Sequence, residues 1–228
     1  MKQIHKFLPV LLVLLLALGL AGCGSGSSGE DEPAAAPSAS EDASADAGEA
    51  EAAEYEHGTI DGTVYTNDFF GFTFTAKDNW TFSNEAELRQ ANQSVSDIVD
   101  NDAVTEALKS GSTFIDMQAF NNDDQLNSIN LTVSYAPGSG GIDDINDATI
   151  SYMQKMYEDA GFTDVSISKT TVTVAGENID ALLTTMGVQG TNVVEKQIFI
   201  ISHDYLGTLT VSGTSEEDCD ELLSWVSK

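Results

Sequence analysis

Strict alternation of apolar and polar residues predicts that parts of this chain are β-strands with one buried face. Successive side chains of a strand point to opposite faces, so a period of two gathers the apolar residues on one side. Such a face must be covered by another layer of structure, which excludes an all-helical fold. The alternating apolar residues are Ile129, Leu131, Val133 and Tyr135 in one segment, and Phe72, Phe74 and Ala76 in another.

Further segments rich in β-branched and aromatic residues, separated by turn residues, predict more strands. These segments are 113–120, 164–175, 179–188, 192–202 and 205–212. The residues of segment 113–120 expected to point inward are Ile115, Met117 and Ala119.

Two of these strands carry irregular patterns. In segment 164–175 the apolar positions change parity between Ile167 and Val172, which predicts a bulge near Lys169-Thr170. In segment 192–202 the unbroken apolar run 198–201 predicts burial on both faces.

Capping residues and helical periodicity predict helices between and after the strands. They are Glu85–Ala91 capped by Asn84, a helix from Ser96 or Asp97 that ends at Gly111, Ala148–Ala160 capped by Asp147, and a C-terminal helix capped by Thr214 or Ser215. Because the strands follow one another as hairpins, the fold class is predicted to be α+β. An antiparallel sheet of about six to eight strands should carry helices packed on it.

The first 22 residues predict a secretory signal: Lys2 and Lys6 precede the apolar run 7–21, which is shorter than a spanning helix needs. The run ends in Leu20-Ala21-Gly22-Cys23, which resembles the bacterial lipobox. The resemblance implies cleavage before Cys23 and a diacylglycerol on its thiol, so the membrane partner would be reached through Cys23. We therefore expect a lipoprotein on the extracytoplasmic face of a bacterial cell membrane.

Residues 23–58 are expected to be the lipidated cysteine and a disordered acidic linker, with the folded domain at 59–228. The linker is rich in Gly, Ser, Ala and acid and contains no Lys or Arg, so it has little to bury. His57 is interpreted as a solvated linker residue. The acidic linker also favours a single-membrane cell.

The charge of the chain argues against nucleic-acid partners. The whole chain carries −28, and residues 59–228 hold 27 acidic against seven basic residues, a net charge of −20. Such a surface repels phosphates and favours cationic partners or metal ions over long range. The same charge also serves simply to keep an exported protein in solution.

The start of the predicted domain resembles PsbP-like domains. The matching residues are Tyr65-Thr66-Asn67, the strand Gly71–Phe74 and Trp80, whereas Lys77 stands where family members often have proline. The resemblance implies an antiparallel sheet sandwiched by helices, with binding or assembly roles and no shared catalytic residues. The matching aromatic residues Phe72, Phe74 and Trp80 are assigned to the core.

No catalytic residue is predicted. A histidine base would have to be His57 or His203, and the triple Ser202-His203-Asp204 consists of neighbours that would point to opposite faces of a strand. Cys219 is interpreted as a buried small hydrophobe, because Cys219, Leu222, Leu223 and Val226 share one helical face.

No metal or cofactor residue is predicted either. Zinc-type Cys/His clusters are absent from the sequence, and the acid-rich segments 97–106, 121–124 and 143–147 do not match a calcium loop. The glycine-rich segment 137–141 lacks the phosphate-loop lysine and is interpreted as a flexible crossing loop, or alternatively as a mobile contact loop.

The leading hypothesis is thus a membrane-anchored, non-catalytic binding or assembly module of the cell envelope, with an envelope protein or glycan as partner. A pocket left uncovered by helices would favour it. The alternatives are a hydrolase of envelope polymer using a carboxylate pair, and a structural envelope protein without a discrete ligand. Two facing acids, one with a raised pKa, would favour the hydrolase.

Overall fold

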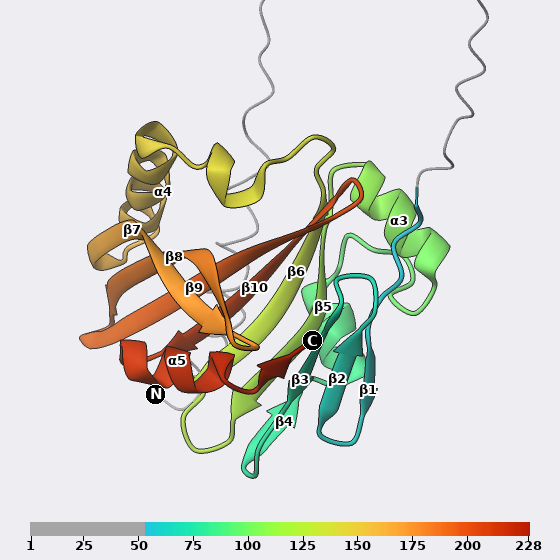
Figure 1. Cartoon of the computed structure of the whole chain (residues 1–228), viewed down its shortest axis with the longest axis horizontal. Coiled ribbons are helices and arrows are strands. Elements are labelled where there is room, and N and C mark those ends of the chain that lie inside the picture. The colour runs from blue at the N-terminus through green and yellow to red at the C-terminus, as the bar shows by residue number, and fades with distance from the viewer. Residues whose placement is uncertain (1–52) are drawn as a thin grey trace, which may run out of the picture.

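The computed structural model describes residues 53–228, which form two antiparallel sheets with helices packed against them (Figure 1). The small sheet has the order β1 (Thr59–Asp61), β2 (Val64–Asn67), β3 (Phe72–Thr75) and β11 (Val226–Ser227). The large sheet has the order β4 (Trp80–Phe82), β5 (Thr113–Asn121), β6 (Ser128–Tyr135), β10 (Tyr205–Gly213), β9 (Thr191–Ser202), β8 (Glu177–Val188) and β7 (Thr163–Val174). The helices are α2 (Glu85–Ala91), α3 (Asn101–Lys109), the 3-10 turn η2 (Gly141–Asp144), α4 (Asp147–Asp159) and α5 (Glu216–Leu223).

The predicted α+β class and the antiparallel pairing of the strands are confirmed. The sequence predicted one sheet, whereas the structure has a second, made of short strands from the two ends of the described chain. The predicted signal peptide, Cys23 and most of the predicted linker lie outside the described residues. Within residues 53–228, no helix is long and apolar enough to cross a bilayer.

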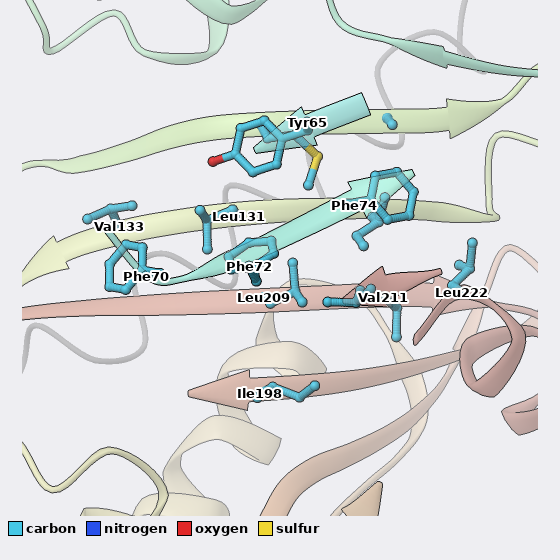
Figure 2. Packing of buried hydrophobic residues seen from close by; sticks show 14 of the residues in the cluster. Tyr65, Phe70, Phe72, Phe74, Leu131, Val133, Ile198, Leu209, Val211 and Leu222 are labelled. Carbon is cyan, nitrogen blue, oxygen red and sulfur yellow. The ribbon is translucent and has the colours of Figure 1, made fainter. Parts of the chain in front are cut away.

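The two faces of the large sheet bury two different apolar clusters. On the inner face, the small sheet, α3 and α5 cover the strands, and Phe72, Phe74, Leu131, Leu209 and Val211 pack together there (Figure 2). The alternation predicted for β6 is confirmed, since its apolar residues lie in this inner cluster. The outer cluster lies under α4, which buries Met153 and Tyr157 against β8 and β9.

The two clusters explain the parity change in β7. Ile167 belongs to the outer cluster, whereas Val172 and Val174 belong to the inner one. The strand therefore pairs regularly through Lys169-Thr170, and the predicted bulge there is wrong. Its apolar face changes because different ends of the strand are covered on opposite sides.

A bulge does occur in β5, where Ile115 pairs with Thr132 but Met117 pairs with Leu131. Because of the extra residue, Ile115 does not belong to the inner cluster, and Phe114 lies there instead. The prediction is thus wrong for Ile115 and confirmed for Met117 and Ala119, which both lie in the inner cluster.

The apolar run of β9 is only partly covered on its two faces. Ile198 and Ile200 pack toward the inner cluster and Phe199 toward the outer one, as predicted. Ile201 is 47% exposed, so burial on both faces ends before this residue.

All four predicted helices are found, and two of them begin at other residues than predicted. Asn84 caps α2 as predicted, and Ser215 caps α5. The second predicted helix, α3, begins at Asn101 behind Asp100 and not at Ser96 or Asp97. The third, α4, begins at Asp147 and is capped by Asn146 rather than by Asp147. Val226 was predicted to belong to the apolar face of α5. It lies beyond the helix in β11, where it pairs with Phe74 of β3.

The packed part of the chain begins before residue 59. Tyr55 is fully buried, and its backbone N–H donates to Oγ1 of Thr105 at 3.1 Å. The backbone N–H of His57 donates to Oδ1 of Asn101 at 3.2 Å. The predicted linker therefore ends before Tyr55, and His57 is fixed to α3 by its backbone rather than being a free linker residue.

A buried carboxylate in the β5 bulge joins this leading segment to the small sheet. Asp116 accepts from the backbone N–H of Gly58 at 2.8 Å, from Nδ2 of Asn67 at 2.9 Å and from the hydroxyl of Tyr65. Burial raises the pKa of Tyr65 well above its ordinary value, and the charge of Asp116 raises it further, so the phenol stays protonated and donates. The bulge thus supplies the acceptor that holds β2 in place.

We predict that Asp116→Ala lowers the free energy of unfolding by about 2–4 kcal/mol, because two buried donors and one part-buried donor lose this acceptor. Urea denaturation of the full chain measures this, with the exposed Asp61→Ala in β1 as the control variant. A loss no larger than that of the control would show that the network does not hold the small sheet.

Candidate functional site

An apolar cavity of about 370 Å³ lies between the two sheets. Its volume falls in the range of pockets that hold small ligands, roughly 300–1,000 Å³. Apart from Gly71, Ser227 and Lys228, every lining residue is apolar. The apolar lining consists of Phe70, Phe72, Val174, Ile179, Ile198, Phe199, Ile200, Ile201, Leu209 and Val226.

Four strands and one turn bring the central lining residues together. Phe72 comes from β3 and Val226 from β11 of the small sheet, while Ile198 and Leu209 come from β9 and β10 of the large sheet. Figure 2 shows Phe72 lying over Leu209, with Ile198 on the next strand of the large sheet. The cavity is therefore a gap in the layer that covers the inner face.

β11 forms one boundary of the cavity. It pairs with β3 through Val226 and Ser227. Val174 at the end of β7 and Ile179 near the start of β8 line another side of the cavity.

A glycine lets the turn before β3 close one side of the cavity. A Cβ at Gly207 in β10 would meet the ring of Phe70 at 3.0–3.1 Å, which is tighter than ordinary packing. The absence of a side chain allows this aromatic ring to lie directly against β10. The ring of Phe70 therefore forms one wall of the cavity.

An ion pair marks one edge of the cavity, which we call the mouth and define by Ser227, Lys228 and Glu177. Nζ of Lys228 pairs with a carboxylate oxygen of Glu177 at the start of β8. The side chains are 60% and 61% exposed, so both charges remain in contact with solvent. Lys228 is the only charged residue in the lining among the described residues.

The side chains of the lining determine which chemistry the cavity offers. Its lining includes no carboxylate, imidazole, thiol or phenol among the residues described. Filling it with apolar atoms would remove apolar surface from water at about 25 cal/mol per Å². The arrangement therefore suits an apolar group, and the polar side chains of its lining, among the described residues, are those of Ser227 and Lys228.

Ser202 and His203 lie closer together than predicted, but residues 202–204 do not form a catalytic triad. Oγ of Ser202 lies 3.2 Å from Nδ1 of His203, because Ser202 ends β9 and His203, with a left-handed backbone (φ 54°), begins the turn to β10. The premise that they point to opposite faces is wrong. In residues 53–228 no carboxylate hydrogen-bonds to His203, and the pair lies exposed.

Cys219 is buried as predicted. Its side chain is inaccessible, and Sγ lies 3.4 Å from the carbonyl oxygen of Val194. Burial raises the pKa of the thiol to about 12, so the reactive thiolate is scarce near neutral pH. The residue packs on the inner face of the large sheet.

The other segments considered in the sequence show no ligand site. In the described part of the chain, no three His, Cys, Asp or Glu side chains lie where they could hold a metal ion together. The glycine-rich segment 137–141 is tied down, because Oδ2 of Asp144 accepts from the backbone N–H of Gly140 at 2.6 Å. Gly141 then packs against Phe199 of β9.

Two buried acids were not predicted from the sequence, Asp116 in the β5 bulge and Glu195 on β9. Glu195 faces the outer cluster between its cross-strand neighbours Ser212 and Thr184, near Tyr157 of α4. The hydroxyl of Ser212 donates to Oε1 at 3.4 Å, while Oε2 has no partner among the described residues. Burial raises the pKa of Glu195 to about 8 from an ordinary 4.5.

The sequence signal that could have identified Glu195 is an acidic residue inside a predicted strand. The residues on both sides of Glu195 are buried. The raised pKa does not mark a carboxylate pair. The other buried carboxyl group, that of Asp116, contacts Tyr65 on the inner face, on the opposite side of the sheet from Tyr157. These two acids therefore do not face each other.

Glu195 predicts a pH dependence of stability. Between pH 4.5 and 8 the unfolded chain has released this proton while the folded chain keeps it, so the free energy of unfolding falls as the pH rises through that range. Above pH 8 the loss is complete. We predict that Glu195→Gln, which does not titrate, gains about 3–5 kcal/mol relative to wild type between pH 4.5 and 8.

Urea denaturation of both chains at several pH values measures this difference. Glu217→Gln on α5, an exposed acid of the same kind, is the matched control and should follow the wild-type pH profile. Parallel profiles for Glu195→Gln and wild type would show that Glu195 is ionised in the folded chain at ordinary pH.

Comparison with known proteins finds structural neighbours only. No family model and no curated protein matches the chain. The chain is similar to the solution structure of cyanobacterial PsbP (CyanoP) from Synechocystis sp. PCC 6803, with 13% identity and a TM-score of 0.43 over 70% of this chain and 87% of that one. It is also similar to the crystal structure of PA94, a Pseudomonas aeruginosa protein of unknown function, with 13% identity and a TM-score of 0.26 over 46% and 69% of the two chains.

The PsbP-like resemblance carried by the motif around Gly71–Phe74 stays a prediction from the sequence. Of the three aromatic residues carried over from that motif, Phe72 and Phe74 are buried, whereas Trp80 is half-buried and packs edge-on against Trp225. The fold class itself rests on the two sheets described above.

Proposed function

We propose that this protein is a non-catalytic, extracytoplasmic binding module, anchored to a cell membrane by lipid on Cys23, that takes an apolar group into the cavity between its sheets. The single observation that carries the proposal is the cavity, with its apolar lining and a volume of about 370 Å³. An envelope protein or glycan, the partner class expected from the sequence, would have to present such a group.

The N-terminal sequence supports the anchored part of the proposal. A linker from residue 24 to the first packed residue, Tyr55, would span roughly 30 Å as a coil, and more with its acidic repulsion. That spacing sets the cavity away from the bilayer while keeping it near the membrane surface.

The site geometry supports binding over hydrolysis. A glycosidase needs two carboxyl groups that flank one bond. The cavity lining contains none, and the buried acids Asp116 and Glu195 lie on opposite faces of the large sheet.

We predict that Cys23→Ala abolishes incorporation of an alkyne-labelled fatty acid and shifts the protein out of the membrane fraction, because the thiol is the acylation site. Metabolic labelling followed by fractionation and immunoblotting measures both effects. Cys219→Ala, which removes the other cysteine, is the matched control and should label and fractionate like wild type. Equal labelling of Cys23→Ala would place the lipid elsewhere.

We predict that an uncharged alkyl probe carrying a diazirine labels the cavity peptides of the full chain in membranes. Ile179→Phe adds a ring at the cavity wall and should reduce that labelling severalfold. Ile60→Phe, the same change at an exposed strand position outside the lining, is the control. Peptide mapping by mass spectrometry that finds equal labelling in both variants would contradict binding in the cavity.

A further inference from the structure

We propose, building on the binding function above, that the ligand of the cavity is a cationic amphiphile. Its apolar chain or ring would fill the cavity, and its amine or quaternary ammonium head would bind Glu177 at the mouth. The proposal follows from the charges that surround the mouth and from the ion pair that now occupies it.

The mouth already holds a cation on Glu177. Lys228 places its ammonium on this carboxylate, showing that a positive group fits there next to the lining residues Val174 and Ile179. The pair is largely exposed, and exposed pairs contribute little, so an incoming head can replace Lys228 at small cost. The displaced ammonium returns to water.

The surroundings of the mouth are acidic. The helix α5 leads directly into β11, contacts β7, and carries five carboxylates: Glu216, Glu217, Asp218, Asp220 and Glu221. The bases near it are engaged, since Lys196 pairs with Glu216 and Asp220, and Lys77 pairs with Glu221.

The wider field has the same sign. Residues 59–228 carry 27 acidic against seven basic residues, a net charge of −20. An anionic head would approach against this potential and would find the only lining cation, Lys228, already neutralised by Glu177. A cationic head would be attracted at long range and received by a carboxylate at short range.

The test uses three photoactivatable probes with the same decyl chain and diazirine, bearing a trimethylammonium, a hydroxyl or a carboxylate head. They are applied to membranes carrying the full chain, and labelling of cavity peptides is divided by labelling of an exposed peptide of the same protein. Ile179→Phe sets the background for labelling outside the cavity.

The proposal predicts that the cationic probe labels best and the anionic probe least. Glu177→Gln should reduce cationic labelling by about two- to fivefold and leave the hydroxyl probe unchanged, the range expected for one exposed ion pair. Lys228→Gln should increase cationic labelling, because Glu177 is released. Glu217→Gln on α5 is the matched control for loss of one acid.

The outcomes separate this proposal from the binding function itself. Equal labelling by the three heads, or best labelling by the carboxylate probe with loss in Lys228→Gln, would overturn the cationic head while leaving the cavity as a binding site. Labelling by every probe no higher than in Ile179→Phe would overturn the binding function. Circular dichroism of each variant verifies that it is folded.

Discussion

The packing of two sheets of unequal width determines the rest of this structure. A four-stranded sheet cannot cover the inner face of a seven-stranded one, so α3 and α5 bury part of what remains. The small sheet is held by the burial of Phe72 and Phe74 against Leu131 and Leu209, an apolar contact that stabilises it without directional bonds. The cavity lies between β3 and β11 of the small sheet and the strands β7 to β10 of the large sheet.

Two buried acids serve this arrangement differently. Asp116 has its donors around it, and by binding Tyr65 and Asn67 it fixes β2, which in turn pairs with β3 at the cavity wall. Glu195 lies on the other face with one oxygen unpartnered among the described residues, so the fold keeps it protonated through a raised pKa. The first acid contributes to the geometry of the site, whereas the second mainly makes stability depend on pH.

Local patterns predicted the elements but not the site. Alternation identified β6 and the strand containing Phe72, and the Asn84 cap placed α2, because these signals depend on near neighbours. The cavity joins Phe72, Ile198 and Val226, and their meeting depends on how two sheets stack, which no local period encodes. Val226 shows the limit: its spacing fits a helical face, yet pairing with β3 takes it into a strand. Likewise, only the β5 bulge turns Asp116 from a surface residue of a regular strand into a buried acceptor.

The most direct test is a crystal structure of the protein determined under xenon pressure, because apolar cavities take up this gas. The account predicts xenon between Phe72, Ile198 and Val226, with the lining side chains in place. Ordered water in that position, or side chains collapsed into the gap with no xenon bound, would contradict an apolar binding cavity between the sheets.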